Sequence, residues 1–388
     1  MSPADSTWLD LSTQPHGTVL IQYHQPFAIS DLSSPELQDP QLIMFIGGRA
    51  KSRSMKRLGF TFDEEVSHNT VRLHLAPELG KTTSPIFLAD CELHDNKQLK
   101  QARTYPVPGS VDHRILHWHK NIPGGFDVYT LANIVYTKLI SPFSTVVCLF
   151  ADDLEGLNAV ARLLASWLVC FRNRRTTRVV TATSPRVIVL REWNDLENGI
   201  FDEKLATRSF MQELRNQSEL RNREQQERLA DHLSQQDIDR LLDLQFGDIR
   251  VLAYTSHPID AGLMTLKDVH FHLRRLDKSW ISLRNRLLQD SHDIQERRRQ
   301  QQMAFSAIHL QALFNSACEH IERDIMTPFN FIRASRSANP VPSRFAEYLS
   351  AFLKETPQKL HLSFNTPIIA SALALDSFPP NMHCKAFP

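Results

Sequence analysis

A basic, glycine-led turn contains the residues best suited to chemistry, Gly47-Gly48-Arg49-Ala50-Lys51-Ser52-Arg53-Ser54, directly after the apolar run LIMFI. The phosphate-binding pattern G-x-x-x-x-G-K-[ST] places backbone N–H groups and a helix N-terminus around a phosphate. With Gly47 first, Ser52 stands at the second Gly, Arg53 at the Lys and Ser54 at the Ser/Thr. We therefore expect Gly47, Gly48, Ser52 and Arg53 to bind phosphate and Ser54 to bind Mg²⁺. The alternative is a basic strand-to-helix turn that binds nothing.

A carboxylate follows the apolar run PIFLA, at Asp90. Nucleoside triphosphatases place the carboxylate that holds Mg²⁺ at such a strand end. We therefore expect Ser54 and Asp90 to share the metal if nucleotide binds. GTPases have D-x-x-G at this point, whereas this chain has Leu93 in place of the Gly. The alternative is an Asp that ends a strand without a ligand.

A possible base-binding segment follows the apolar run PRVIVLRE, at Asn194 and Asp195. The order of strand, acidic turn, long helix and strand before it resembles the second half of a small Ras-like GTPase. That family reads guanine with N-K-x-D, which is absent here. The resemblance implies a degenerate P-loop GTPase-like domain over residues 41–195, with GTP or ATP as the nucleotide.

A second resemblance rests on longer phrases, PIFLADCEL, LANIVYTKLISPFSTVVCLFADDLEGL, FSAIHLQALFNSACEHI and SFPPNMH. The sequence is similar to the N-terminal, non-catalytic region of patatin-like (FabD/lysophospholipase-like) proteins of filamentous fungi. In that group the region precedes a lipid hydrolase domain. The hydrolase needs a G-x-S-x-G nucleophile, and this sequence contains none, so the resemblance transfers no catalytic residue.

Two further clusters of polar residues could take part in chemistry, but each also has an ordinary structural interpretation. Cys91, His94, His113 and His117 have some of the spacing of zinc ligands, although ordinary loop histidines are more common. Asp152, Asp153 and Glu155 could bind a metal or exchange protons, but acidic residues ahead of a helix usually cap its positive end. We favour the cap.

The elements that must position these residues alternate between strands and helices up to residue 195. Strands are expected at Thr18–Tyr23, Leu42–Gly48, Val71–Leu75, Pro85–Leu93, Ser144–Asp153 and Pro185–Glu192, and helices at Asp127–Ile140 and Gly156–Leu168. This order predicts an α/β fold with a mostly parallel sheet of the P-loop GTPase-like type, followed by an all-α region. The expected units are a partly disordered leader over 1–40, the α/β domain over 41–195, a helical domain over 196–359 and a linker-like tail over 360–388.

The composition excludes several classes of protein. A net charge of +1 from 44 basic and 43 acidic residues argues against nucleic-acid binding. No apolar stretch is long enough for a transmembrane helix, and we expect no such segment. Five scattered cysteines do not form a disulfide framework, which suggests the cytoplasm. Only 12 glycines are present, and a GTPase needs Gly where this chain has Ser52 and Leu93.

These observations predict a nucleotide-linked regulatory domain with weak or lost hydrolysis of GTP or ATP, without the catalytic domain of a patatin-like hydrolase. The alternative is a non-catalytic interaction module that binds no nucleotide. In either case the helical region, including the polar stretch of residues 218–244, is a candidate surface for a protein partner.

Overall fold

The structure is a computed structural model of the 388-residue chain. It describes residues 7–14, 17–23, 32–60, 70–76, 82–92, 111–116, 128–169, 184–193, 201–226, 235–254, 266–301, 303–324, 327, 329–331, 334, 345–355 and 365–369.

The described strands form one mixed sheet of nine strands in the order β6-β2-β1-β4-β5-β3-β7-β8-β9. Their bounds are β1 Thr7–Gln14, β2 Gly17–Tyr23, β3 Gln41–Gly47, β4 Thr70–Leu75, β5 Ile86–Glu92, β6 Val111–Ile115, β7 Val146–Phe150, β8 Arg186–Glu192 and β9 Asp248–Tyr254. The strands β5, β3, β7, β8 and β9 are parallel to one another. Every pairing among β5, β4, β1, β2 and β6 is antiparallel.

The fold is therefore α/β, but the prediction of a mostly parallel P-loop-type sheet followed by an all-α region is wrong. Two strands from the expected leader, β1 and β2, extend the sheet on its antiparallel side. The strand β9 comes from the region expected to be helical and pairs in parallel with β8. Hydrophobic periodicity cannot show pairing direction, and the seven residues of β9 lie between long runs of helix formers.

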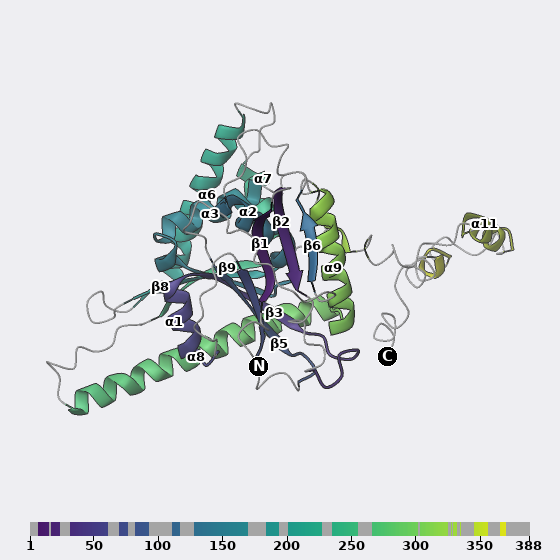
Figure 1. Ribbon diagram of the computed structural model, residues 1–388. Coiled ribbons are helices and arrows are strands. Elements are labelled where there is room, and N and C mark those ends of the chain that lie inside the picture. Colours follow the sequence, from purple (N-terminus) through teal and green to yellow (C-terminus); the bar gives the residue numbers. More distant parts are fainter. Residues whose placement is uncertain are drawn as a thin grey trace.

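Helices pack on both faces of the sheet (Figure 1). The described helices are α1 Arg49–Arg57, α2 Val128–Ile134, α3 Leu157–Val169, α6 Glu203–Gln226, α7 Gln235–Gln245, α8 Leu266–Gln300, α9 Ala307–Arg323 and α11 Phe345–Glu355, of which α11 contributes no residue to the two cores. Short helical segments are the π-helix Val135–Ile140 and the 3₁₀ turns Ser141–Phe143 and Ala151–Asp153. One face packs against α1 and α8, and the other against α2, α3, α6, α7 and α9.

The central strands are apolar throughout because both of their faces are covered. In β3, Ile43 and Phe45 pack toward α1 and α8, while Leu42, Met44 and Ile46 pack toward the opposite helical layer. All seven residues of β3 are buried. Every residue of β5 and of β7 is buried as well.

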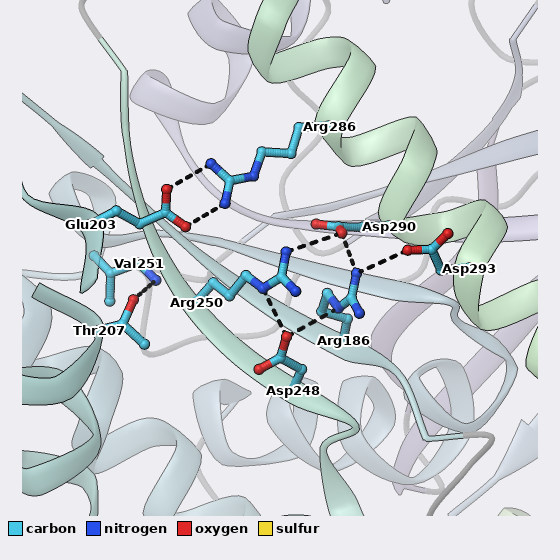
Figure 2. A network of polar contacts seen from close by, with 9 residues as sticks. All are labelled: Arg186, Glu203, Thr207, Asp248, Arg250, Val251, Arg286, Asp290 and Asp293. Atoms are coloured by element: carbon cyan, nitrogen blue, oxygen red, sulfur yellow. Dashed lines mark hydrogen bonds and ion pairs between the residues drawn. The ribbon is translucent and has the colours of Figure 1, made fainter.

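The helix α8 is joined to the starts of the parallel strands by a buried ion-pair network (Figure 2). Asp290 of α8 binds Arg186, the first residue of β8, and both are almost fully buried. Arg250 of β9 contacts Asp290 at 3.4 Å and Asp248 at 2.8 Å. Asp293 lies 3.8 Å from Arg186 with 42% of its side chain exposed. The network therefore fixes α8 against β8 and β9.

The edge strand β9 is covered by α6 (Figure 2). The Val251 N–H of β9 donates to the Thr207 hydroxyl of α6 at 3.0 Å. Glu203, at the start of α6, pairs with Arg286 of α8. An edge strand with open N–H groups invites pairing with another chain, and these contacts occupy one such group.

We predict that Asp290→Ala lowers the free energy of unfolding by about 3 kcal/mol, because it leaves the buried Arg186 without its nearest carboxylate. Asp293→Ala, one turn further along α8, removes a half-exposed carboxylate and is expected to cost less than about 1 kcal/mol. Urea unfolding of both variants measures the difference. Equal losses would show that burial of Asp290 does not decide the stability of the network.

Candidate functional site

The candidate site lies at the carboxyl ends of β3 and β7. From β3 the chain reaches β5 on one side and later β7 on the other, so the strand order reverses between β3 and β7. In open α/β sheets, ligands bind outside the carboxyl ends of the strands at such a point. Gly47 ends β3 here and Gly48 follows it, and the turn Ala151–Asp153 follows β7.

The chain passes from β3 into α1 with a single residue between them. β3 ends at Gly47 and α1 begins at Arg49. A phosphate-binding loop needs several backbone N–H groups ahead of the helix, and Gly48 alone cannot supply them. Ser52, Arg53 and Ser54 consequently lie inside α1, where Ser52 and Arg53 are exposed and Ser54 is buried.

The carboxylate of Asp153 occupies the N-terminus of α1. Asp153 Oδ2 accepts hydrogen bonds from the N–H groups of Gly48 at 2.7 Å and Lys51 at 2.8 Å. Asp153 Oδ1 accepts from the N–H group of Ala50 at 2.8 Å. These are the N–H groups at the positive end of a helix that would face a phosphate. The sequence predicts that the acidic turn caps the helix that follows it, but Asp153 caps α1 instead, more than a hundred residues earlier in the chain.

Gly47 gives the Asp153 carboxylate room to approach. A Cβ atom at position 47 would lie 2.7 Å from Asp153 Oδ2 and 3.0 Å from the Cβ atoms of Lys51 and Phe150. At Gly48 the nearest atom, Asp153 Oδ1, would be at 3.6 Å, an ordinary contact. The first glycine is thus explained by close packing around a side chain of the protein itself.

Asp90 lies in a buried ion-pair cluster with Lys51 and Arg72. Lys51 Nζ is 2.5 Å from Asp90 Oδ1, and Arg72 donates to Asp90 Oδ2 at 2.9 Å. Lys51 is fully buried and also donates to the Cys91 carbonyl at 2.9 Å. Burial acts to raise the pKa of Asp90, but the charges of Lys51 and Arg72 outweigh it and hold that pKa below its usual value. Asp90 is therefore ionised and already matched by two cations.

Lys51 is the buried cation that the phosphate-loop alignment missed. That alignment gave the role of the cation to Arg53. A helix that begins at Arg49 instead places Lys51 on the same face as Met55 and Leu58, and all three are buried. Helical spacing alone therefore could have shown that Lys51 points inward.

The neighbouring Asp152 joins the ends of three parallel strands. Asp152 Oδ2 accepts a hydrogen bond from the Glu192 N–H of β8 at 2.7 Å and from the Tyr254 hydroxyl of β9 at 3.0 Å. Burial, together with the Asp152 charge, raises the pKa of the Tyr254 phenol well above its usual value. Tyr254 is therefore a hydrogen-bond donor here and no acid–base catalyst near neutral pH.

The remaining expected residues do not assemble around these. Asn194, Asp195 and Leu93 lie outside the described residues, as do His94 and His117. Cys91 is buried in β5, while His113 is exposed on β6, which is separated from β5 by three strands. Within the described residues, no group of three His, Cys, Asp or Glu side chains is placed to hold a metal. The Ser54 hydroxyl is buried and has no hydrogen-bond partner in the described part of the chain.

Two comparisons of the sequence, with protein-family models and with curated proteins, yield no match. The sequence matches no protein family, and no curated protein is significantly similar to it. Among the described residues, no helix is both long and apolar enough to cross a membrane.

We predict that Lys51→Met lowers the free energy of unfolding by about 3 kcal/mol, because Asp90 stays buried after losing its nearest cation. Arg53→Met, two residues along the same helix but exposed, is the matched control and should change stability by less than about 0.5 kcal/mol. Chemical denaturation of both proteins tests this. Similar stabilities would mean that Lys51 is not the counter-charge on which Asp90 depends.

A second prediction concerns acid. Because the pKa of Asp90 is lowered on folding, its ion pairs contribute in full above the unfolded value of about 3.9, and the contribution is lost as pH falls through the folded value. The stability difference between the wild type and Asp90→Asn should thus shrink as pH falls below about 4. Unfolding measured from neutral pH into this range checks it, with the exposed Asp243→Asn as the baseline. A difference independent of pH would contradict the ion-pair assignment.

Proposed function

We propose that this chain is a non-catalytic interaction module that binds no nucleotide. The observation that supports this most directly is the Asp153 carboxylate at the N-terminus of α1. A phosphate in that position would have to displace a carboxylate held by three backbone N–H groups. The proposal replaces the nucleotide-linked regulatory role that the sequence motifs favour.

The neighbouring residues do not fit a magnesium nucleotide either. Asp90 is matched by Lys51 and Arg72, so binding Mg²⁺ would require at least one of these buried cations to move. Ser54 is buried within α1 rather than exposed ahead of it. Arg53 is on the exposed side of that helix. The residues expected to hold phosphate and metal therefore do not face one common site. Asp90 lies in a buried ion-pair cluster, Ser54 is buried in α1 and Arg53 is exposed to solvent.

Two further expectations from the sequence, the resemblance to patatin-like proteins and a cytoplasmic location, belong to the same proposal. Similarity to the non-catalytic region of patatin-like proteins suggests a role that depends on contacts, since the nucleophile motif is absent. We also propose a cytoplasmic location, supported by Cys91, Cys148 and Cys318, which are free thiols buried in the described part of the chain. Burial raises the pKa of each of these thiols, which makes them unreactive.

The test is binding of fluorescent GTP and ATP analogues with Mg²⁺, together with release of inorganic phosphate. We expect no saturable binding at high micromolar nucleotide and no phosphate release above the buffer rate. Arg53→Ala and Asp153→Asn serve as comparison variants, after circular dichroism has shown that both are folded. Saturable wild-type binding that Arg53→Ala weakens would overturn the proposal in favour of a nucleotide site.

A further inference from the structure

An exposed row of arginines on α1 has no carboxylate partner among the residues that the structure describes. Arg49, Arg53 and Arg57 are spaced four residues apart, so they share one face of the helix over about 12 Å. All three side chains are exposed, and the described structure shows no ion pair for any of them. We call these three residues the arginine stripe. Lys56 lies beside it, and α1 contains no acidic residue at all.

Arg49, the first residue of the stripe, stands at an unfavourable position in the helix that carries it. The positive end of a helix favours acidic side chains in the first turn, yet α1 begins with Arg49 and has no acid there. The nearby Asp153 carboxylate is directed at backbone N–H groups and so does not pair with Arg49. Arg49 thus stands where it disfavours the helix, and no described carboxylate compensates for it. A residue that breaks a local rule without such compensation is typical of a binding surface.

We propose that the arginine stripe is a docking surface for an acidic segment of a partner protein. The inference rests on the proposed function, since an interaction module needs such a surface. Guanidinium groups bind carboxylates through two parallel N–H···O bonds. Four-residue spacing along a helix separates the groups by about 6 Å, which matches carboxylates two residues apart on an extended peptide. Arg57 is also partly ordered, because its guanidinium lies 5.9 Å from the ring of Trp280.

Two other polyanions fit less well. Membrane-binding helices bury an apolar face in the lipid, whereas the apolar residues of α1, Ala50 and Met55, are already buried against the sheet. Nucleic-acid binding requires a broad positive surface, but this chain has a net charge of only +1. A short acidic peptide needs no more than these three arginines, for which the described part of the chain shows no ion pair.

The experiment measures fluorescence anisotropy of a labelled (Glu-Ala)6 peptide at low salt, where charge interactions are screened least. The wild type should bind it saturably, more weakly as salt is added, and should not bind (Gln-Ala)6. The variant Arg49→Gln/Arg53→Gln should weaken binding at least about fivefold. Lys204→Gln/Arg208→Gln is the matched control, because it removes two exposed charges four residues apart on α6, and it should bind like the wild type.

Several results would overturn the inference. They are absence of (Glu-Ala)6 binding, equal weakening in both double variants, or stripe-dependent binding of phosphatidylserine vesicles or single-stranded DNA that is tighter than peptide binding. None of them depends on nucleotide. Failure of the peptide test with no nucleotide binding rejects the stripe alone, whereas nucleotide binding rejects the proposed function independently.

Discussion

The carboxyl edge of the sheet depends on one interaction, the bonding of the Asp153 carboxylate to the N-terminus of α1. It joins the turn after β7 to the helix after β3, the two strands between which the strand order reverses. It also compensates α1, which has no acidic residue in its first turn. The close approach requires glycine at position 47. A position that binds ligands in related architectures is here a structural contact within the chain.

Two buried ion pairs attach the helical layer formed by α1 and α8 to the sheet, one near the carboxyl ends of the parallel strands and one at their amino ends. Lys51 of α1 reaches Asp90 near the end of β5, and Asp290 of α8 reaches Arg186 at the start of β8. Such pairs offset their own desolvation rather than adding much net stability, but removing one partner leaves a buried charge. Each pair therefore penalises any packing that separates its members. The two pairs fix where each helix lies on an otherwise uniform apolar face.

The sequence was sufficient to locate most of the central elements, because strands such as LIMFI and VVCLF are apolar without interruption and helices such as α3 have clear periodicity. The sequence was insufficient to locate β9 or to predict which strands pair antiparallel, because both depend on contacts between distant segments. The phosphate-loop alignment was misleading because it compared residue types and not the position at which α1 begins. Helical spacing from Arg49 would have placed Lys51 inside and Arg53 outside. The partnership of Asp153 with residues more than a hundred positions away had no signal in a single sequence.

The near-zero net charge conceals a separation of charge between the interior and the surface. Asp90 and Asp290 face inward and are matched by buried cations. Asp153 is also directed inward, but backbone N–H groups bind it rather than a cation. Asp153 is thereby used within the fold, and among the described residues Arg49, Arg53 and Arg57 have no ion pair on the surface of α1. Because the Asp153 carboxylate is bound by backbone N–H groups at the N-terminus of α1, it does not neutralise the arginines on the outer face of that helix, and this is the charge arrangement on which the proposed acidic partner depends.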